Sequence, residues 1–157
     1  MRMAIDPYAE MQVRSLLLHL DLSSAEIALR GFEVSRSSSA EEAIHHAKAF
    51  VCAVRRVGRI GARFAQVANL PPEVAAAVRL AWRKKASFFG GYIATRNAIE
   101  HIDGELSGKD NWVLMNLVGD RLEATEGISA EVSLSALGSV SSFRDELHAA
   151  MGIWPNS

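Results

Sequence analysis

The sequence predicts a mainly α-helical protein, in which a helical bundle is built on two long antiparallel helices at about 40–68 and 72–103. Apolar residues recur at helical spacing over both stretches, and Pro71-Pro72 separates them. After Gly104 the spacing changes to the alternation of strands, which predicts a small β-meander before a final short helix. With 157 residues, one domain is expected, comprising a helical part over 1–103 and a β-rich appendage with a terminal helix over 104–157.

Two short helices are predicted before the first long one. Asp6-Pro7 has the pattern of an N-cap followed by proline at the first helical position. An apolar stripe to about residue 20 follows, formed by Leu16, Leu17 and Leu20. Ser23-Ser24-Ala25-Glu26 has the spacing of a capping box, so a second helix is expected to run to about Val34. The serine-rich segment 35–39 is predicted to be a loop.

The helix at 40–68 has two distinct stripes, and another capping box, Ser39-Ala40-Glu41-Glu42, opens it. Its apolar stripe consists of Ile44, Val51, Val54, Val57, Phe64 and Val67. Its basic stripe consists of Lys48, Arg55, Arg59 and Arg63. A solvated face and a phosphate-contacting face both fit the basic stripe. Gly58 and Gly61 are expected to allow close helix packing, and Gly90-Gly91 predicts a kink or a close backbone approach in the next helix.

The C-terminal third is predicted to contain three strands and a helix. Residues 111–117 and 121–125 have β character, with a turn at Gly119-Asp120 between them. After a second turn at Glu126-Gly127, a third strand is expected from the alternation of Ile128, Ala130, Val132 and Leu134. The final helix is predicted from about Val140 to Met151.

Composition excludes several classes of protein. The net charge is −1, but residues 40–103 hold ten Lys/Arg against five Asp/Glu, and 104–157 hold three against eight. The two parts either pack together or leave a basic helical surface that can meet phosphates. The single Cys52 excludes a disulfide framework. With no signal-peptide pattern at the N-terminus and no apolar run of about 20 residues, a soluble cytoplasmic protein with no membrane contact is expected.

The segment Arg96-Asn97-Ala98-Ile99-Glu100-His101-Ile102-Asp103 contains the densest group of reactive side chains. At 100° per residue, one arc of about 160° holds Arg96, Asn97, Glu100, His101 and Asp103. Trp82, Phe89 and Ile93 lie in the middle of the same arc. This face of the helix is aromatic and apolar in its earlier turns and polar in its last turns, which favours a cleft or a subunit interface. The alternative is a central helix that emerges into water.

Arg96-Asn97-x-x-x-His101 resembles the R-x4–6-H motif of HEPN domains, which are small α-helical bundles with two long antiparallel helices. The resemblance covers about 40–103. It departs from the family at Asp103, where many HEPN ribonucleases have tyrosine, and in the β-rich tail, which indicates a divergent subfamily. The resemblance implies a homodimer that acts as a metal-independent endoribonuclease without cofactors, of toxin, defence or RNA-processing type, with RNA and a cognate antitoxin or regulatory protein as partners.

The resemblance also implies roles for individual residues. Arg96 would hold the scissile phosphate, Asn97 would orient the phosphate or the histidine, and His101 would transfer protons. Supporting positions would be Glu100 and Asp103, and RNA contacts would come from Arg55, Arg59 and Arg63. Glu100 is also spaced to pair with Arg96 at i,i+4.

Two other functions stay open. One is a non-catalytic dimerisation or regulatory module of the same fold. The other, which is weaker, is a metal-binding bundle, suggested by Glu42-x-x-His45 with Glu41 and His46 beside it. A second E-x-x-H copy, which a di-iron site requires, is missing from the sequence.

Overall fold

The computed structural model describes residues 6–105, 115–125 and 127–152, with side chains left out at 102–105. Its elements, in chain order, are α1 (Pro7–Ser35), α2 (Ala40–Phe64), α3 (Pro72–Glu105), β1 (Asn116–Val118), β2 (Arg121–Thr125), β3 (Ile128–Glu131) and α4 (Leu134–Met151). The predicted fold class, a helical bundle with a small β-meander and a final helix, is confirmed. Within these ranges, no helix is both long and apolar enough to cross a membrane.

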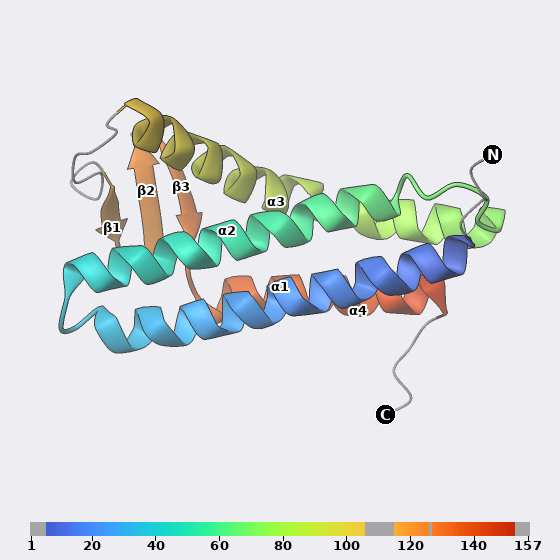
Figure 1. The fold of residues 1–157 in the computed structure, drawn as a ribbon, viewed down its shortest axis with the longest axis horizontal. Helices are drawn as coiled ribbons and strands as arrows, with labels where there is room; N and C mark the ends of the chain where they lie inside the picture. Colours follow the sequence, from blue (N-terminus) through green and yellow to red (C-terminus); the bar gives the residue numbers. More distant parts are fainter. Residues whose placement is uncertain (1–5, 106–114, 126, 153–157) are drawn as a thin grey trace.

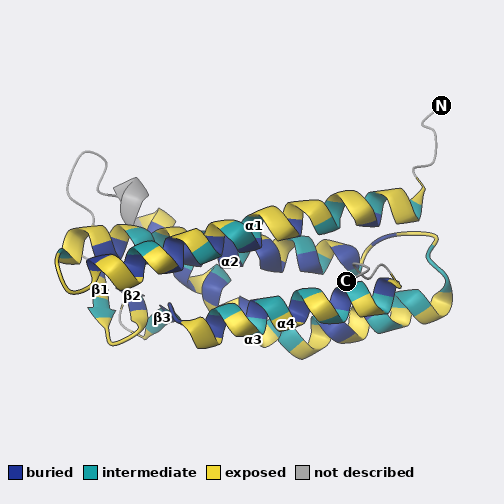
Figure 2. Cartoon of the chain, turned by 90° about the horizontal axis from the view of Figure 1, so that it is seen from below, coloured by how far each residue is buried: buried dark blue, intermediate teal, exposed yellow. Residues whose placement is uncertain are grey.

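The helices form two layers, and the sheet lies at one end of them. Figure 1 shows α1 and α2 as a long antiparallel pair, and Figure 2 shows α3 and α4 packed beneath that pair. Between the layers lies a core whose largest buried side chains include five phenylalanines: Phe32, Phe50, Phe64, Phe89 and Phe143. The burial colours of Figure 2 place the buried positions on the facing sides of the two layers.

The two long central helices begin where the sequence predicts. The Ser39 hydroxyl accepts a hydrogen bond from the Glu42 backbone N–H and caps α2. α2 ends at Phe64 rather than at 68, and Asn69 adopts a left-handed φ of 64° in the connection to α3. Asp6 caps α1 by accepting from the Tyr8 N–H.

Close packing occurs at Gly58 and Gly61 of α2, not at Gly90 and Gly91 of α3. A Cβ on Gly58 would lie 2.9 Å from the Phe89 ring, and one on Gly61 would lie 2.5 Å from the Phe143 ring. The prediction for these two glycines is confirmed. At Gly90 and Gly91, a Cβ would meet nothing within 4 Å. The prediction of a close backbone approach at these two glycines is therefore wrong.

Instead of two short helices, the N-terminal part forms the single helix α1. The Ser24 hydroxyl donates to the Leu20 carbonyl, four residues back, and so stays compatible with a continuous helix instead of capping a new one. The apolar stripe was also assigned to the wrong face, because the buried side chains of α1 include Leu18, Leu22 and Phe32. The predicted stripe is exposed, at 59% for Leu16, 47% for Leu17 and 54% for Leu20.

The three strands form an antiparallel sheet in the order β1-β2-β3, and α3 covers it. Gly119, with a φ of 60°, makes the predicted first turn. Part of the first predicted strand, 111–114, lies outside the described residues. The third strand ends at Glu131, and α4 begins at Leu134, six residues before the prediction. The reason is Ser133, whose hydroxyl accepts from the Ala136 N–H and caps the helix.

Candidate arginine site between α2 and α3

The motif lies in the last turns of α3, and its side chains differ in exposure. Arg96 is 24% exposed and forms an ion pair with Glu100, which is 54% exposed. Asn97 and His101 are exposed. The Asp103 side chain lies outside the described residues. Five residues of a helix turn the chain by about 140° beyond one full turn, so α3 directs Arg96 and His101 toward different sides.

The aromatic stripe of α3 is covered by the same chain rather than by another subunit. Trp82 and Phe89 stack with ring centroids 5.8 Å apart, and Phe89 contacts the Phe143 ring of α4 at 5.0 Å. The sequence-based inference of an open groove or subunit interface at these aromatics is therefore wrong. A helix of this bundle buries its own aromatic stripe against its neighbours.

The period of the core explains where the polar residues lie. Buried positions of α3 fall on rows with a seven-residue repeat, as in Val78, Tyr92 and Ile99, with the partly buried Lys85 completing the row. A seven-residue repeat drifts by about 20° per heptad on a wheel of 3.6 residues per turn, so a wheel with a fixed angle misplaces the last turns. In the seven-residue register, Arg96 follows Trp82 and Phe89. Asn97 and His101 occupy registers that are also exposed one heptad earlier, at Gly90 and Ala94.

Arg96 is thus the one polar residue of the segment 96–101 that continues the aromatic stripe, and it lies near enough to a basic residue of α2 to influence it electrostatically. Partial removal from water, followed by the charges of Arg96 and Arg59, lowers the pKa of Arg55. Arg55 is half-buried, and its Nε atom is inaccessible and has no hydrogen-bond acceptor among the described residues. The structure therefore brings together Arg55, Arg59 and Arg96, which the sequence assigned to RNA.

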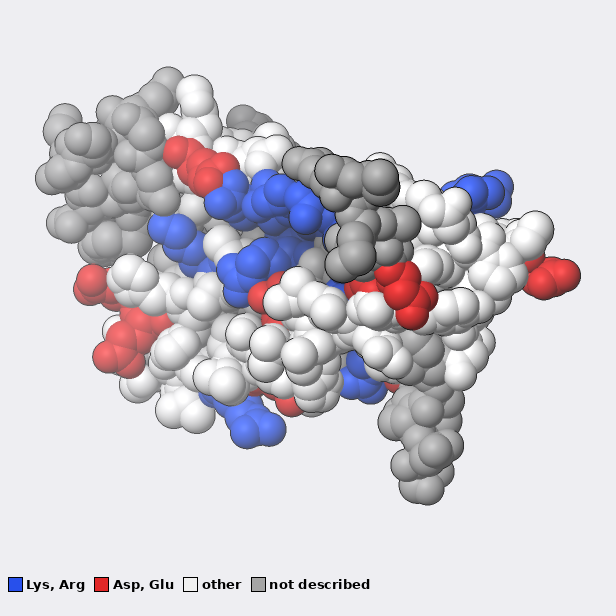
Figure 3. Space-filling model, turned by 45° about the vertical axis from the view of Figure 1, so that its right-hand side comes forward, with Lys and Arg blue, Asp and Glu red and all other residues white. Residues whose placement is uncertain are grey.

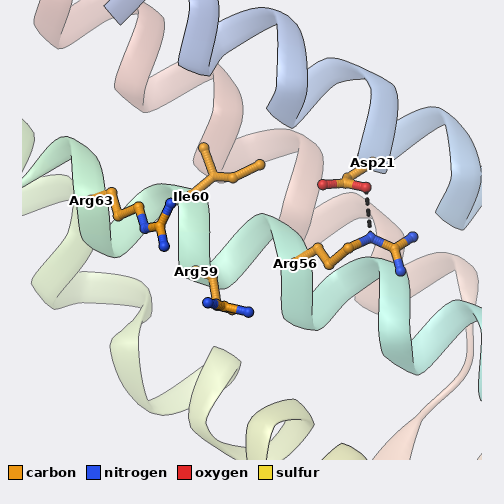
Figure 4. A pocket seen from close by; sticks show the side chains of 5 residues that line it. All are labelled: Asp21, Arg56, Arg59, Ile60 and Arg63. Atoms are coloured by element: carbon orange, nitrogen blue, oxygen red, sulfur yellow. Dashed lines mark hydrogen bonds and ion pairs between the residues drawn. The ribbon is translucent and has the colours of Figure 1, made fainter. Parts of the chain in front are cut away.

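A second part of the basic surface lies between α1 and α2. Figure 4 shows a pocket lined by Asp21, Arg56, Arg59, Ile60 and Arg63. The Arg56 Nε donates to the Asp21 carboxylate at 2.8 Å. Arg59 extends on the side of α2 turned away from α1 (Figure 4). Sequence reasoning missed Arg56, although its position beside Arg55 in a helix with arginines at 55, 59 and 63 was a usable signal.

Basic side chains gather on one face of the molecule, and only a few acidic ones interrupt them (Figure 3). Guanidinium groups bind phosphate oxygens with paired hydrogen bonds, and they remain charged at any physiological pH. Such a surface can hold a phosphate group or the backbone of a nucleic acid.

The residues suggested as metal ligands do not assemble into a site. Glu42 and His45 are exposed, and the His46 ring packs against Gly31 of α1. In the described ranges, no three His, Cys, Asp or Glu side chains are grouped in a way that would hold a metal ion.

No family model, curated protein or solved structure matches this chain.

Proposed function

We propose that the chain is a HEPN-like protein that binds RNA at the arginine site and cleaves it without a metal ion. The observation that carries the proposal is the position of Arg96 beside Arg55, which joins the motif arginine to the basic stripe of α2. Phosphate neutralisation by arginine supplies most of the affinity of proteins for RNA backbones. The proposal implies a cytoplasmic protein, and a cognate antitoxin or regulatory protein as a further partner.

The chemistry follows from the side chains. The 2′-oxygen of the RNA attacks the phosphorus, the bond from phosphorus to the 5′-oxygen breaks, and a 2′,3′-cyclic phosphate and a 5′-hydroxyl form. A base takes the proton of the 2′-hydroxyl, and an acid protonates the leaving 5′-oxygen. His101 would transfer these protons, because imidazole titrates near neutral pH. Because α3 directs Arg96 and His101 toward different sides, the RNA backbone would have to wrap around the end of α3 to meet both side chains. Arg96 would then stabilise the charge on the phosphate, and Asn97 would orient it.

The test is cleavage of a 5′-labelled RNA in the presence of EDTA, since the 5′ fragment is the one that carries the cyclic phosphate. The wild-type protein is expected to release fragments with a cyclic phosphate, and His101→Ala is expected to lose about 100-fold or more of the rate. His45→Ala, another exposed histidine, serves as the control and keeps full activity. Equal rates for wild type and His101→Ala, or no cleavage by any variant, would overturn the proposal.

A non-catalytic dimerisation module is the second candidate, and a specific feature of α1 favours it. Besides its buried face, α1 carries a second apolar stripe at intervals of seven residues. The stripe consists of Val13, Leu20, Ile27 and Val34, and these side chains are 54–76% exposed. In this second candidate function, the ion pair with Glu100 is a structural role for the motif arginine, Arg96.

The occupant proposed for this stripe is the α1 helix of a second copy. A seven-residue repeat is the pattern by which helices pair side by side, and two copies related by a two-fold axis present the same row to each other. Sedimentation equilibrium is expected to show a dimer for the wild type and a monomer for Leu20→Asp/Ile27→Asp, with unchanged helicity. Gln12→Asp, an exposed position beside the stripe, is the control. A wild type that stays monomeric at high concentration would exclude the dimer.

A further inference from the structure

The Arg55 side chain has an unmet hydrogen-bonding requirement. Its Nε atom is inaccessible and lacks an acceptor among the described residues. Buried polar groups in folded proteins almost always have partners, so an exception indicates a ligand, an ion or a water that completes the site. The group left unsatisfied here is a donor that carries positive charge, so the missing partner is an acceptor, and an anion fits best.

The charges around Arg55 lead to the same kind of ligand. The neighbouring charges that lower the pKa of Arg55 come from Arg96, Arg59 and Arg56, in that order. Two carboxylates balance part of this group, since Asp21 pairs with Arg56 and Glu100 pairs with Arg96. Neither Arg55 nor Arg59 has an ion pair with a described residue. Four guanidinium groups therefore face two carboxylates, which leaves an excess of two positive charges.

We propose that Arg55, Arg59 and Arg96 form a subsite for one phosphate group, and that Glu100 is paired with Arg96 until a phosphate binds and replaces it. The subsite deepens the proposed function, on which it rests for its location in an RNA-binding surface. The phosphate oxygens accept from the guanidinium of Arg96 and, once the partly exposed Arg55 side chain turns enough to uncover it, from the Arg55 Nε. A phosphate replaces the carboxylate because it offers more acceptor oxygens and bridges several arginines at once.

Glu100 is suited to being displaced. It is more than half exposed and lies on the same helix face as Arg96, one turn later, so releasing it requires only a side-chain rotation. In the protein without a bound anion, the Glu100 carboxylate takes the place beside Arg96 that the phosphate would occupy. Removing the Glu100 charge therefore frees Arg96 and strengthens phosphate binding.

The chemistry of the subsite is shared by free phosphate, a terminal phosphate monoester and an internal phosphodiester. Three probes distinguish these sources: inorganic phosphate, adenosine 5′-monophosphate, and a dinucleotide with a 2′-O-methyl group that blocks cleavage. A subsite for the RNA backbone binds the dinucleotide, and a subsite for RNA ends prefers the monophosphate. Tighter binding of inorganic phosphate than of both nucleotides would overturn the link to RNA.

The experiment is an NMR titration of the arginine Nε–H resonances at constant ionic strength, with chloride as the balancing anion. The Arg55 resonance, identified by its loss in Arg55→Lys, is expected to move downfield with phosphate. Glu100→Gln is expected to bind about threefold tighter than wild type, in keeping with the modest strength of an exposed ion pair. Glu73→Gln, an exposed glutamate at the other end of α3, is the matched control and binds as wild type does.

An Arg55 resonance that does not respond to phosphate would overturn the subsite. Equal affinities of Glu100→Gln and Glu73→Gln would overturn the role given to Glu100. These failures are distinguishable from failure of the proposed function. If the protein cleaves RNA but the Arg55 resonance does not change with phosphate, only the subsite is contradicted. If the protein binds phosphate but cleaves no RNA, only the ribonuclease function is contradicted.

Discussion

Arg55 on α2 and Arg96 on α3 lie close to each other, and burial, followed by the positive charge of Arg96, lowers the pKa of Arg55. Each comes from a different stripe of the sequence: Arg55 from the basic row of α2, and Arg96 from the end of the aromatic row of α3. Gly61 and Gly58 of α2 accommodate the rings of Phe143 and Phe89, and Arg55 lies about one turn before Gly58. The close helix packing that builds the core thus also brings the two arginines together.

The cluster of Arg55, Arg59 and Arg96 is expected to lower the free energy of unfolding when no anion is bound. Arg55→Met keeps most of the apolar stem but removes the charge and the unsatisfied Nε, so it should raise the free energy of unfolding by about 0.5–2 kcal/mol. Arg63→Met changes an exposed arginine of the same helix and should have little effect. Urea unfolding in phosphate-free buffer measures both. If Arg55→Met were less stable than wild type, the charge and the unsatisfied Nε of Arg55 would not destabilise the folded protein.

The glycines of the long helices should respond in opposite directions to alanine. In Gly58→Ala, the new Cβ would lie 2.9 Å from the Phe89 ring, which should destabilise the protein by about 1–3 kcal/mol. Gly90→Ala meets nothing within 4 Å and should stabilise α3 by about 1 kcal/mol. Chemical denaturation of the two variants tests the packing, and equal effects would contradict it.

Tyr92 connects α3 to the sheet and should make stability depend on alkaline pH. Its hydroxyl donates to the Glu131 carbonyl at 2.6 Å, and burial, followed by the charge of Glu131, raises its pKa. Because the unfolded chain ionises first, near pH 10, this stability is present below that pH and is lost as pH rises further. Tyr92→Phe should lose about 0.5–1.5 kcal/mol at pH 8 and show less alkaline destabilisation than wild type.

The control is Tyr8→Phe, which changes the other tyrosine of the chain, an exposed one. Urea midpoints at pH 8 and pH 11 provide the comparison. If Tyr8→Phe and Tyr92→Phe behaved alike, the contact with Glu131 would contribute nothing.

His148 should make stability depend on acidic pH. Its Nε2 lies 2.5 Å from the Ser15 hydroxyl of α1, and burial, followed by the charge of Arg144, lowers its pKa. The unfolded chain takes up a proton near pH 6.5, so this stability is present above that pH and is lost as pH falls through the lower pKa of the folded protein. His148→Gln should reduce the loss between pH 7.5 and pH 5, and His45→Gln should not. Thermal melts across this range test the difference.

The elements whose signals are local could be predicted from the sequence. Ser39 at the start of α2, the two-proline connection and the glycines of the β-turns each fix the backbone through neighbouring residues. The errors occur where two local signals compete. The serines of α1 have the spacing of a cap, but Ser24 bonds to its own helix, and α1 has an apolar stripe on each side, of which only tertiary packing selects one.

The arginine site was predictable only in part. The basic row of α2 and the motif of α3 are visible in the sequence, but Arg55 and Arg96 are 41 residues apart in the chain, and their proximity depends on how α2 and α3 pack against each other. The helical wheel grouped Arg96 and His101 in one polar arc of about 160°, whereas in the structure Arg96 is partly buried and His101 is exposed. Arg56 and its partner Asp21 were missed because an ion pair between α1 and α2 has no local signal.

The most direct test of the account is the salt dependence of RNA binding, measured by fluorescence anisotropy with a short labelled single strand. Replacing Arg55 and Arg96 with glutamine should weaken binding and lower the slope of log affinity against log salt by about 0.7, the change expected for one lost phosphate contact, because both arginines hold the same phosphate. Arg79→Gln/Arg83→Gln removes the same charge from exposed positions of α3. A larger loss in the Arg55/Arg96 pair is the result predicted here, and equal losses in the two pairs would contradict it.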